Sequence, residues 1–167
     1  MMIASSLIQP GSGYVRAVGP EVTVAKAGDA VLLSFASCGS CHFCNSAHPA
    51  FCAQFAALNF ATLDEDYTLA SDSSKTVQGS FFGQSSFAST ALVKERSVVN
   101  VTDLVKDKEE LKLLAPLGCG LQTGSGTIIR IAKATKEDSI AVLGLGGVGL
   151  SAIMVGEVPC DLGCIAR

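Results

Sequence analysis

The sequence contains no tryptophan, and aromatic residues occupy only 6% of its 167 positions. Large aromatic anchors are therefore scarce, whereas its 17 glycines favour tight turns and close approaches of the backbone. Basic residues are also few, since 12 Lys and Arg against 15 Asp and Glu give a net charge of -3. Without a basic face, the chain is not expected to bind nucleic acid. No G-X-Y or heptad repeat is present, which excludes collagen and coiled coil.

Long uncharged segments are equally limited, and the one candidate for a membrane span is 139–156, SIAVLGLGGVGLSAIMVG. Its length approaches the roughly 20 residues that cross a bilayer. Its clustered glycines favour a strand, a turn and a helix instead, so no membrane segment is expected. The first ten residues carry no Lys or Arg before their apolar stretch, unlike a secretory signal. The protein is therefore expected in the cytoplasm.

The 49% of hydrophobic residues is enough for one domain or two small ones, each with a core. Apolar and polar residues alternate over 13–35 with Gly-Pro and Gly-Asp breaks, which predicts two or three short strands. The predicted buried face comprises Val15, Val22, Val24, Val31 and Leu33. Further strands are predicted over 86–93 and 97–101, and the polar segment 62–80 is expected to be an excursion loop.

From about residue 103 the pattern becomes helical. Asp107 is a suitable cap for a short helix that ends before Pro116. A second helix is predicted to begin with Pro116 in its first turn and to continue through residue 134. The apolar strand 139–145, a glycine turn and a helix over 150–158 follow. The chain thus changes from a β-rich part to the opening of an α/β unit.

Four of the seven cysteines follow the spacing C-x2-C-x2-C-x7-C, and they are Cys38, Cys41, Cys44 and Cys52. Four thiolates suit Zn²⁺ at about 2.3 Å and leave no position for water, so such a site would be structural. One alternative is an iron-sulfur cluster, although the ferredoxin motif ends in C-x3-C-P. The other is a set of unligated or disulfide-bonded cysteines. His42 and His48 lie within the same segment and are expected to face solvent.

The segment Gly144-Leu145-Gly146-Gly147-Val148-Gly149 lies between the predicted strand and helix. In a G-x-G-x-x-G motif, the first glycine permits a tight turn, and the second lets backbone N–H groups approach a pyrophosphate. The third lets the helix pack closely on the strand. The alternative is a glycine-rich packing turn. Pro159 is expected to end the helix, and residues 158–167 offer no apolar run for a next strand, so a complete dinucleotide fold is not expected.

Cys119 lies near the start of the helix predicted from Pro116, where the helix dipole favours a thiolate for metal ligation or reactivity. The alternative is a small buried cysteine on a glycine-lined packing surface. Cys160 and Cys164 are assigned no role.

Four segments, read together, carry a family resemblance: SFASCGSCHFCNSAHPAFC, GSFFGQSSFA, LGCGLQTGSG and IAVLGLGGVGLSAIMVG. They resemble the medium-chain zinc-dependent alcohol dehydrogenases, particularly the aryl (benzyl) alcohol dehydrogenase branch, over about residues 11–156. The resemblance implies a mixed fold. Residues 1–115 would form a GroES-like, β-rich catalytic domain with a structural zinc lobe, lacking its N-terminal part. Residues 116–167 would form a partial Rossmann dinucleotide-binding domain.

The resemblance also implies roles for individual residues. The four clustered cysteines match the structural-zinc ligands, and Cys119 matches one ligand of the catalytic zinc. Thr123 falls where the family contacts the nicotinamide side of the cofactor. The pyrophosphate turn corresponds to Gly144, Gly146, Gly147, Val148 and Gly149. The implied cofactors are zinc and NAD(P), and the implied reaction oxidises a primary, aryl alcohol to an aldehyde.

Two departures from the family put this activity in doubt for the chain as given. The first catalytic ligand of the family lies upstream of the sequence, and Gln9-Pro10 stands where a Gly-His-Glu motif would supply the second. Neither residue suits Zn²⁺. The chain is therefore expected to be a fragment, truncated at both ends and inactive alone. Its incomplete parallel sheet favours association into homo-oligomers. The alternative is a non-catalytic, zinc-stapled interaction module.

Overall fold

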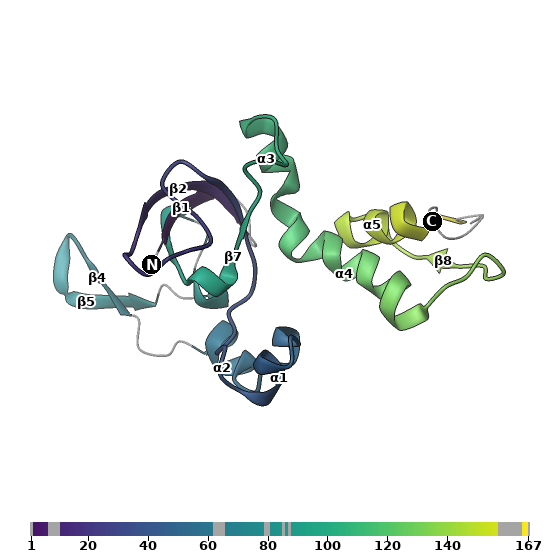
Figure 1. The fold of residues 1–167 in the computed structure, drawn as a ribbon, viewed down its shortest axis with the longest axis horizontal. Helices are drawn as coiled ribbons and strands as arrows, with labels where there is room; N and C mark the ends of the chain where they lie inside the picture. The colour runs from purple at the N-terminus through teal and green to yellow at the C-terminus, as the bar shows by residue number, and fades with distance from the viewer. Residues whose placement is uncertain are drawn as a thin grey trace. The chain divides into compact units, whose positions relative to one another are not determined.

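The computed structural model describes residues 2–6, 11–61, 66–78, 81–84, 86, 88–156 and 165–166. The chain forms two compact units, Met1–Ala115 and Pro116–Arg167 (Figure 1). The strands of the first unit are β1 (Met2–Ser6), β2 (Ser12–Val18), β3 (Ala30–Leu33), β4 (Asp66–Leu69), β5 (Asp72–Gln78), β6 (Ala88–Val93) and β7 (Val98–Asn100). Its helices and 3-10 turns are α1 (His42–Asn45), η1 (Pro49–Phe51), α2 (Phe55–Phe60), η2 (Phe81–Gly83), η3 (Glu95–Ser97) and α3 (Lys108–Leu114).

Five strands of the first unit form an antiparallel sheet in the order β6-β1-β2-β3-β7. The strands predicted over 13–35, 86–93 and 97–101 are all present. No strand is predicted at residues 2–6, where β1 pairs with β2 on one side and β6 on the other. The expected loop at 62–80 is instead, in part, a hairpin of β4 and β5, because Tyr, Thr and Val residues there suit paired strands.

The sheet is buried on both faces around β3, whose four residues are all shielded from solvent. On one face Val31 and Leu33 belong to an apolar cluster with Val15, Ala25, Ala91, Val93 and Val98. On the other face, Ala30 and Leu32 pack with Leu111 of α3. The side chain of Asp107 caps α3 as predicted, since it accepts hydrogen bonds from the N–H groups of Glu109 and Glu110 at 2.9 Å.

The prediction of a buried face is confirmed at every position but one. Val15, Val31 and Leu33 are buried and Val22 is partly buried. Val24 is exposed, because it lies between strands, where its N–H donates to Glu95 at 3.1 Å. Alternation of apolar and polar residues predicts which side chains are buried only where the chain is part of the sheet.

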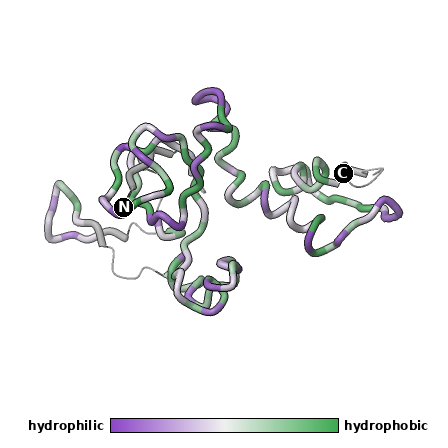
Figure 2. Tube along the Cα trace, in the orientation of Figure 1, coloured by the Kyte–Doolittle hydropathy of each residue, from purple (hydrophilic) through white to green (hydrophobic). Residues whose placement is uncertain are grey.

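The second unit contains α4 (Gly120–Gly126), η5 (Thr127–Ala132), β8 (Ala141–Val142), α5 (Gly147–Gly156) and β9 (Ile165–Ala166). The backbones of α4 and α5 touch, since a Cβ on Gly124 would overlap the Val148 carbonyl oxygen and the Ser151 hydroxyl. Figure 2 shows that α5 carries mainly hydrophobic residues. Among the described residues, no helix combines the length and apolar character needed to cross a bilayer.

Two sequence predictions for this unit are wrong. The helix expected over 116–134 is present as α4 and η5, but its start is wrong. Residues 115–118 form the 3-10 turn η4 (Ala115–Gly118), and α4 begins only at Gly120, because Cys119 has the non-helical angles φ -148° and ψ -84°. Residues 158–167 do supply a strand, since β9 pairs in parallel with β8. Backbone hydrogen bonds make this pairing, so two residues suffice without an apolar run. Pro159 lies outside the described residues.

Candidate functional site

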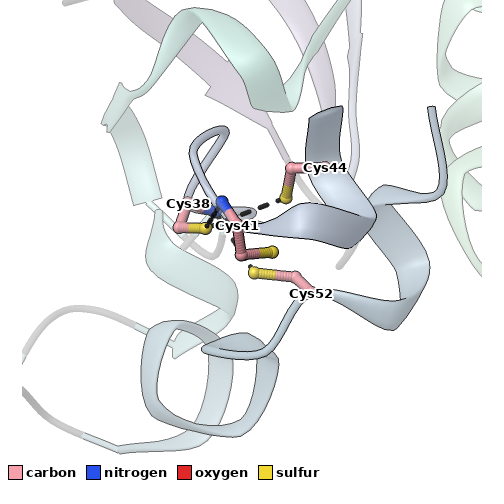
Figure 3. A group of neighbouring side chains, drawn as sticks. All are labelled: Cys38, Cys41, Cys44 and Cys52. Carbon is pink, nitrogen blue, oxygen red and sulfur yellow. Dashed lines mark hydrogen bonds between the residues drawn. The ribbon is translucent and has the colours of Figure 1, made fainter. Parts of the chain in front are cut away.

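The four clustered cysteines of the first unit converge on one point (Figure 3). Their Sγ atoms all lie within 4.8 Å of one another, and Cys38 Sγ is 3.8 Å from Cys44 Sγ. A tetrahedral ion with metal–sulfur bonds of about 2.3 Å has sulfur–sulfur edges of about 3.8 Å. The cluster therefore has the ligand number, chemistry and size of a closed zinc site. Among the described residues, no other His, Cys, Asp or Glu side chains gather in this way.

Short local elements deliver these side chains. Cys38 lies in the loop after β3, Cys41 precedes α1, Cys44 lies within α1, and Cys52 follows η1. Pro49 opens η1, where its fixed φ suits the first position of a helical turn. These short elements bring all four sulfurs of segment 38–52 to one centre.

Backbone N–H groups point at the sulfurs. Cys38 Sγ accepts from the N–H groups of Cys41 at 3.3 Å and Ser40 at 3.5 Å. Cys52 Sγ accepts from the N–H groups of Cys38 at 3.3 Å and Gln54 at 3.4 Å. Such donors stabilise a thiolate over a thiol, which is the form that binds a metal.

Backbone hydrogen bonds and burial shift the pKa values of the cysteines in opposite directions. The N–H groups of Ser40 and Cys41 lower the pKa of Cys38 to about 5. The N–H groups of Ala53 and Cys44 also lower the pKa of Cys41. Burial raises the pKa of Cys44 to about 11. Four thiolates at this separation repel one another, so a divalent cation is the partner that would let all four ionise together.

The state of the cysteine and histidine side chains reduces the alternatives to a zinc site in this segment. Cys38, Cys41, Cys44 and Cys52 are free rather than disulfide-bonded. His42 and His48 are exposed, as expected, and neither belongs to the cluster. An iron-sulfur cluster remains the alternative occupant, because its irons also take four thiolates.

A buried amide joins the two ends of the cysteine lobe, defined as residues 37–61. Asn59 of α2 is fully buried. Its Oδ1 accepts from the Ala36 N–H at 2.8 Å, and its Nδ2 donates to the carbonyl oxygens of Ala36 at 2.9 Å and Phe55 at 2.8 Å. Ala36 immediately precedes the lobe, so Asn59 holds the two ends of the lobe together.

The glycine motif of the second unit forms the turn between β8 and α5. Gly144 has φ +97°, a region that favours glycine. A Cβ on Gly149 would overlap the Gly144 carbonyl oxygen and lie 3.4 Å from Val142 Cγ1, so α5 packs directly on the end of β8. A Cβ on Gly146 or Gly147 would meet open space. The N–H of Leu150 makes the first bond within the helix, to Gly146 at 2.9 Å, which leaves the preceding N–H groups, that of Val148 included, without a helical partner.

Cys119 and Thr123 lie at the start of α4. Cys119 is exposed, which contradicts the alternative of a small buried packing cysteine. The Thr123 hydroxyl donates to the Cys119 carbonyl oxygen at 2.8 Å. Gln9, Pro10, Cys160 and Cys164 lie outside the described residues.

A family model for the alcohol dehydrogenase GroES-like domain matches residues 7–103. The matched segment contains the four clustered cysteines and is more than half of the chain. The chain belongs to this family. The expected GroES-like fold and the resemblance to zinc alcohol dehydrogenases are thereby confirmed.

The relatives of this chain are substantially longer. A protein named "Probable alcohol dehydrogenase" from Pseudomonas sp is 44% identical over 89% of this chain and 46% of its own length. Geraniol dehydrogenase from Castellaniella defragrans is 44% identical over 86% of the chain and 38% of its own length. The chain thus spans less than half of the curated relatives it matches.

Solved structures of alcohol dehydrogenases share its fold. The zinc-binding domain protein from Burkholderia ambifaria is 40% identical with a TM-score of 0.79, over 97% of this chain and 43% of that one. Benzyl alcohol dehydrogenase from Acinetobacter calcoaceticus is 40% identical with a TM-score of 0.78, over 94% and 41%.

Sequence reasoning missed two residues with contacts in the cysteine lobe, Asn59 and Arg96. Asn59 is a lone amide in the apolar segment FAALNF, and that contrast is a usable sign of a buried polar contact. Arg96 lies far along the chain, with its guanidinium against Gly39. No local pattern marks it, because the contact depends on how the sheet brings distant segments together.

Proposed function

We propose that this chain is part of a zinc-dependent, NAD(P)-linked alcohol dehydrogenase that oxidises a primary, aryl alcohol to an aldehyde. The geometry of the four sulfurs within the matched GroES-like segment is the observation that carries this proposal. The names of two relatives, geraniol dehydrogenase and benzyl alcohol dehydrogenase, support a primary alcohol beside a π system.

In this proposal residues 1–115 are the catalytic domain and residues 116–167 begin the cofactor domain. The four clustered cysteines hold a structural zinc that cross-links the lobe, since all four ligand positions are filled by protein. Cys119 is a ligand position for the catalytic metal of the longer protein. When bound, that metal would supply Lewis-acid polarisation of the alcohol, and NAD(P) would supply the hydride acceptor.

The turn after β8 is the proposed pyrophosphate site. Its contribution is the open space beside Gly146 and Gly147 and the unpaired N–H groups at the start of α5, which favour an anion. Gly144 and Gly149 shape the turn, and Thr123 is the proposed contact for the nicotinamide.

The 167-residue polypeptide alone is proposed to be inactive, because it contains only one residue that matches a catalytic-zinc ligand. The second candidate function is a non-catalytic zinc-stapled module acting through protein contacts. The first unit favours it, since that unit carries its own sheet, apolar core and cysteine cluster.

Metal analysis and ligand binding of the purified chain test these proposals. We expect one zinc per chain, no NAD-dependent oxidation of benzyl alcohol, and a rise in melting temperature with NAD(P) through the glycine turn. Zinc without any effect of NAD(P) would favour the module. Robust alcohol oxidation would contradict the proposed inactivity, and visible absorbance from an iron-sulfur cluster would overturn the zinc site.

The same protein is proposed to reside in the cytoplasm, to act without nucleic acid or membrane, and to form homo-oligomers. Exposed apolar side chains support association, including Leu143 at 88% exposure and Ile131 at 79%. Sedimentation of the purified chain tests this, and a monomer at micromolar concentration would contradict it.

A further inference from the structure

The cysteine lobe contains no charged side chain of its own. Between Asp29 and Asp64 the sequence has no Lys, Arg, Asp or Glu. Four thiolates around one divalent cation carry a net charge of -2. A loaded cluster would therefore hold two uncompensated negative charges in a segment that supplies no cation except exposed histidines.

Arg96, from η3, brings a cation to this segment. Its guanidinium lies against Gly39, the residue after Cys38, where a Cβ on Gly39 would overlap the Cζ and Nε atoms of Arg96. Gly39 has φ +71°, so glycine suits both the backbone and the guanidinium that covers it. Gly39 lies between Cys38 and Ser40, and the Ser40 N–H donates to Cys38 Sγ at 3.5 Å. Arg96 thus contacts the stretch of backbone that joins two of the cysteines.

The backbone around Arg96 is anchored on both sides. The carboxylate of Glu95 accepts from the Thr23 N–H at 2.7 Å. The hydroxyl of Ser97 donates to the Phe35 carbonyl oxygen at 3.1 Å, and the Ser97 carbonyl oxygen accepts from the Ser34 N–H at 2.9 Å. These hydrogen bonds therefore fix the position of the Arg96 backbone relative to the sheet.

Within the described part of the chain, no carboxylate forms an ion pair with the Arg96 guanidinium. Among the described residues, the ion pairs are Lys75 with Asp72 and Lys112 with Glu109, and neither involves Arg96. The neighbouring Glu95 carboxylate is directed to the backbone of residues 23 and 24. The residue that the Arg96 guanidinium does contact is Gly39, next to Cys38, so its charge lies beside the cysteine cluster.

We propose that Arg96 is a positioning residue of the cysteine cluster, which clamps the loop at Gly39 and compensates the negative charge of the metal-loaded site. The inference rests on the proposed zinc site and adds to it a residue from outside the cysteine motif. Residues around the ligands of a metal typically change its affinity by about 10-fold to 100-fold when they are removed.

The rate of zinc release to a chelator tests this inference. Zinc content and release are measured for the wild type, Arg96→Gln, Arg96→Lys and the control Lys94→Gln. Lys94 is an exposed cation two residues away, so its substitution removes the same charge without touching Gly39. We expect release from Arg96→Gln to be at least about 10-fold faster than from the wild type. Lys94→Gln should match the wild type, and Arg96→Lys should lie closer to the wild type than to Arg96→Gln.

The salt dependence of zinc release distinguishes the charge of Arg96 from its packing against Gly39. Arg96 is exposed, so dissolved ions screen its electrostatic field. Raising the salt concentration should accelerate release from the wild type and narrow its difference from Arg96→Gln. A wild type that holds zinc and an Arg96→Gln variant that releases it at the same rate would overturn this inference alone. A wild type without zinc would overturn the proposed zinc site as well. Circular dichroism confirms that the compared variants are folded.

Discussion

The sheet and the cysteine lobe of the first unit are stabilised by different interactions. The face of the sheet around Val31 and Leu33 is a cluster of seven buried apolar residues. In the lobe, residues 37–61, only Cys52 and Asn59 are buried. One is a metal-ligand candidate and the other a hydrogen-bonded amide, so the lobe has almost no apolar core.

This difference predicts separate responses to perturbation. Burial of apolar surface stabilises the sheet whatever the metal content. The lobe is too small and too exposed to fold by burial alone, and a bound ion would replace the missing core. Metal removal should therefore disorder the lobe while the sheet persists. A cavity in the sheet should instead destabilise the sheet while the metal site of the lobe persists.

The largest expected effect is the loss of a cysteine ligand. Cys52→Ser should abolish stoichiometric zinc binding, because a serine hydroxyl is a poor ligand for Zn²⁺. Amide hydrogen exchange should then show lost protection in the lobe and retained protection in β2, β3 and β7.

The matched control for this change is Cys119→Ser, which alters an exposed cysteine outside the cluster. It should keep one zinc per chain and wild-type exchange. Full zinc content in Cys52→Ser, or equal loss of zinc in both variants, would contradict the assignment of the cluster.

A cavity in the sheet should give the next largest effect. Leu33 is fully buried, and Leu33→Ala should lower the free energy of unfolding by about 2–5 kcal/mol. Leu113→Ala is the control, since Leu113 is 77% exposed and its loss should change stability by less than about 0.5 kcal/mol. Denaturant titration measures both. A wild-type midpoint for Leu33→Ala would show that β3 is not the centre of the core.

The same contrast explains how much of the molecule the sequence could predict. The cysteine spacing is local, so the cluster could be proposed before its geometry was known. The cap at Asp107 is equally local. The place of β1 in the sheet depends on pairing with the distant β6, and no local pattern reports that pairing.

The other wrong sequence predictions fall where a helix or a strand is interrupted. The helix expected from Pro116 is interrupted at Cys119, which lies between two glycines of low helix propensity, so that α4 begins only at Gly120. Val24 follows the apolar pattern of the strands but lies between them. Tertiary hydrogen bonds to Glu95 decide its conformation, and these are not visible in the sequence.

Loss of the buried amide of Asn59 should have an intermediate effect. Asn59→Ala leaves the N–H and carbonyl groups of Ala36 without partners, which should lower the stability of the lobe by about 2 kcal/mol. Hydrogen exchange at Ala36 should rise. The control Asn45→Ala removes an exposed amide with one hydrogen bond, to Ser40, and should have a smaller effect. Equal exchange at Ala36 in the wild type and Asn59→Ala would refute the role of this contact.

The smallest expected effect is a pH dependence at the junction of the sheet and η3. Hydrogen bonds from the Thr23 N–H, the Thr23 hydroxyl and the Val24 N–H lower the pKa of Glu95 below its ordinary value of 4.5. A carboxylate with a lowered pKa stabilises the fold above pH 4.5, and this contribution is lost as the pH falls through the lowered value. Glu95→Gln should therefore lower stability at neutral pH and flatten its decline in acid. Glu137→Gln, which removes a charge in the second unit, should leave the decline in acid unchanged. A decline in acid as steep in Glu95→Gln as in the wild type would show that the ionised Glu95 does not hold the turn at residues 23 and 24 against η3.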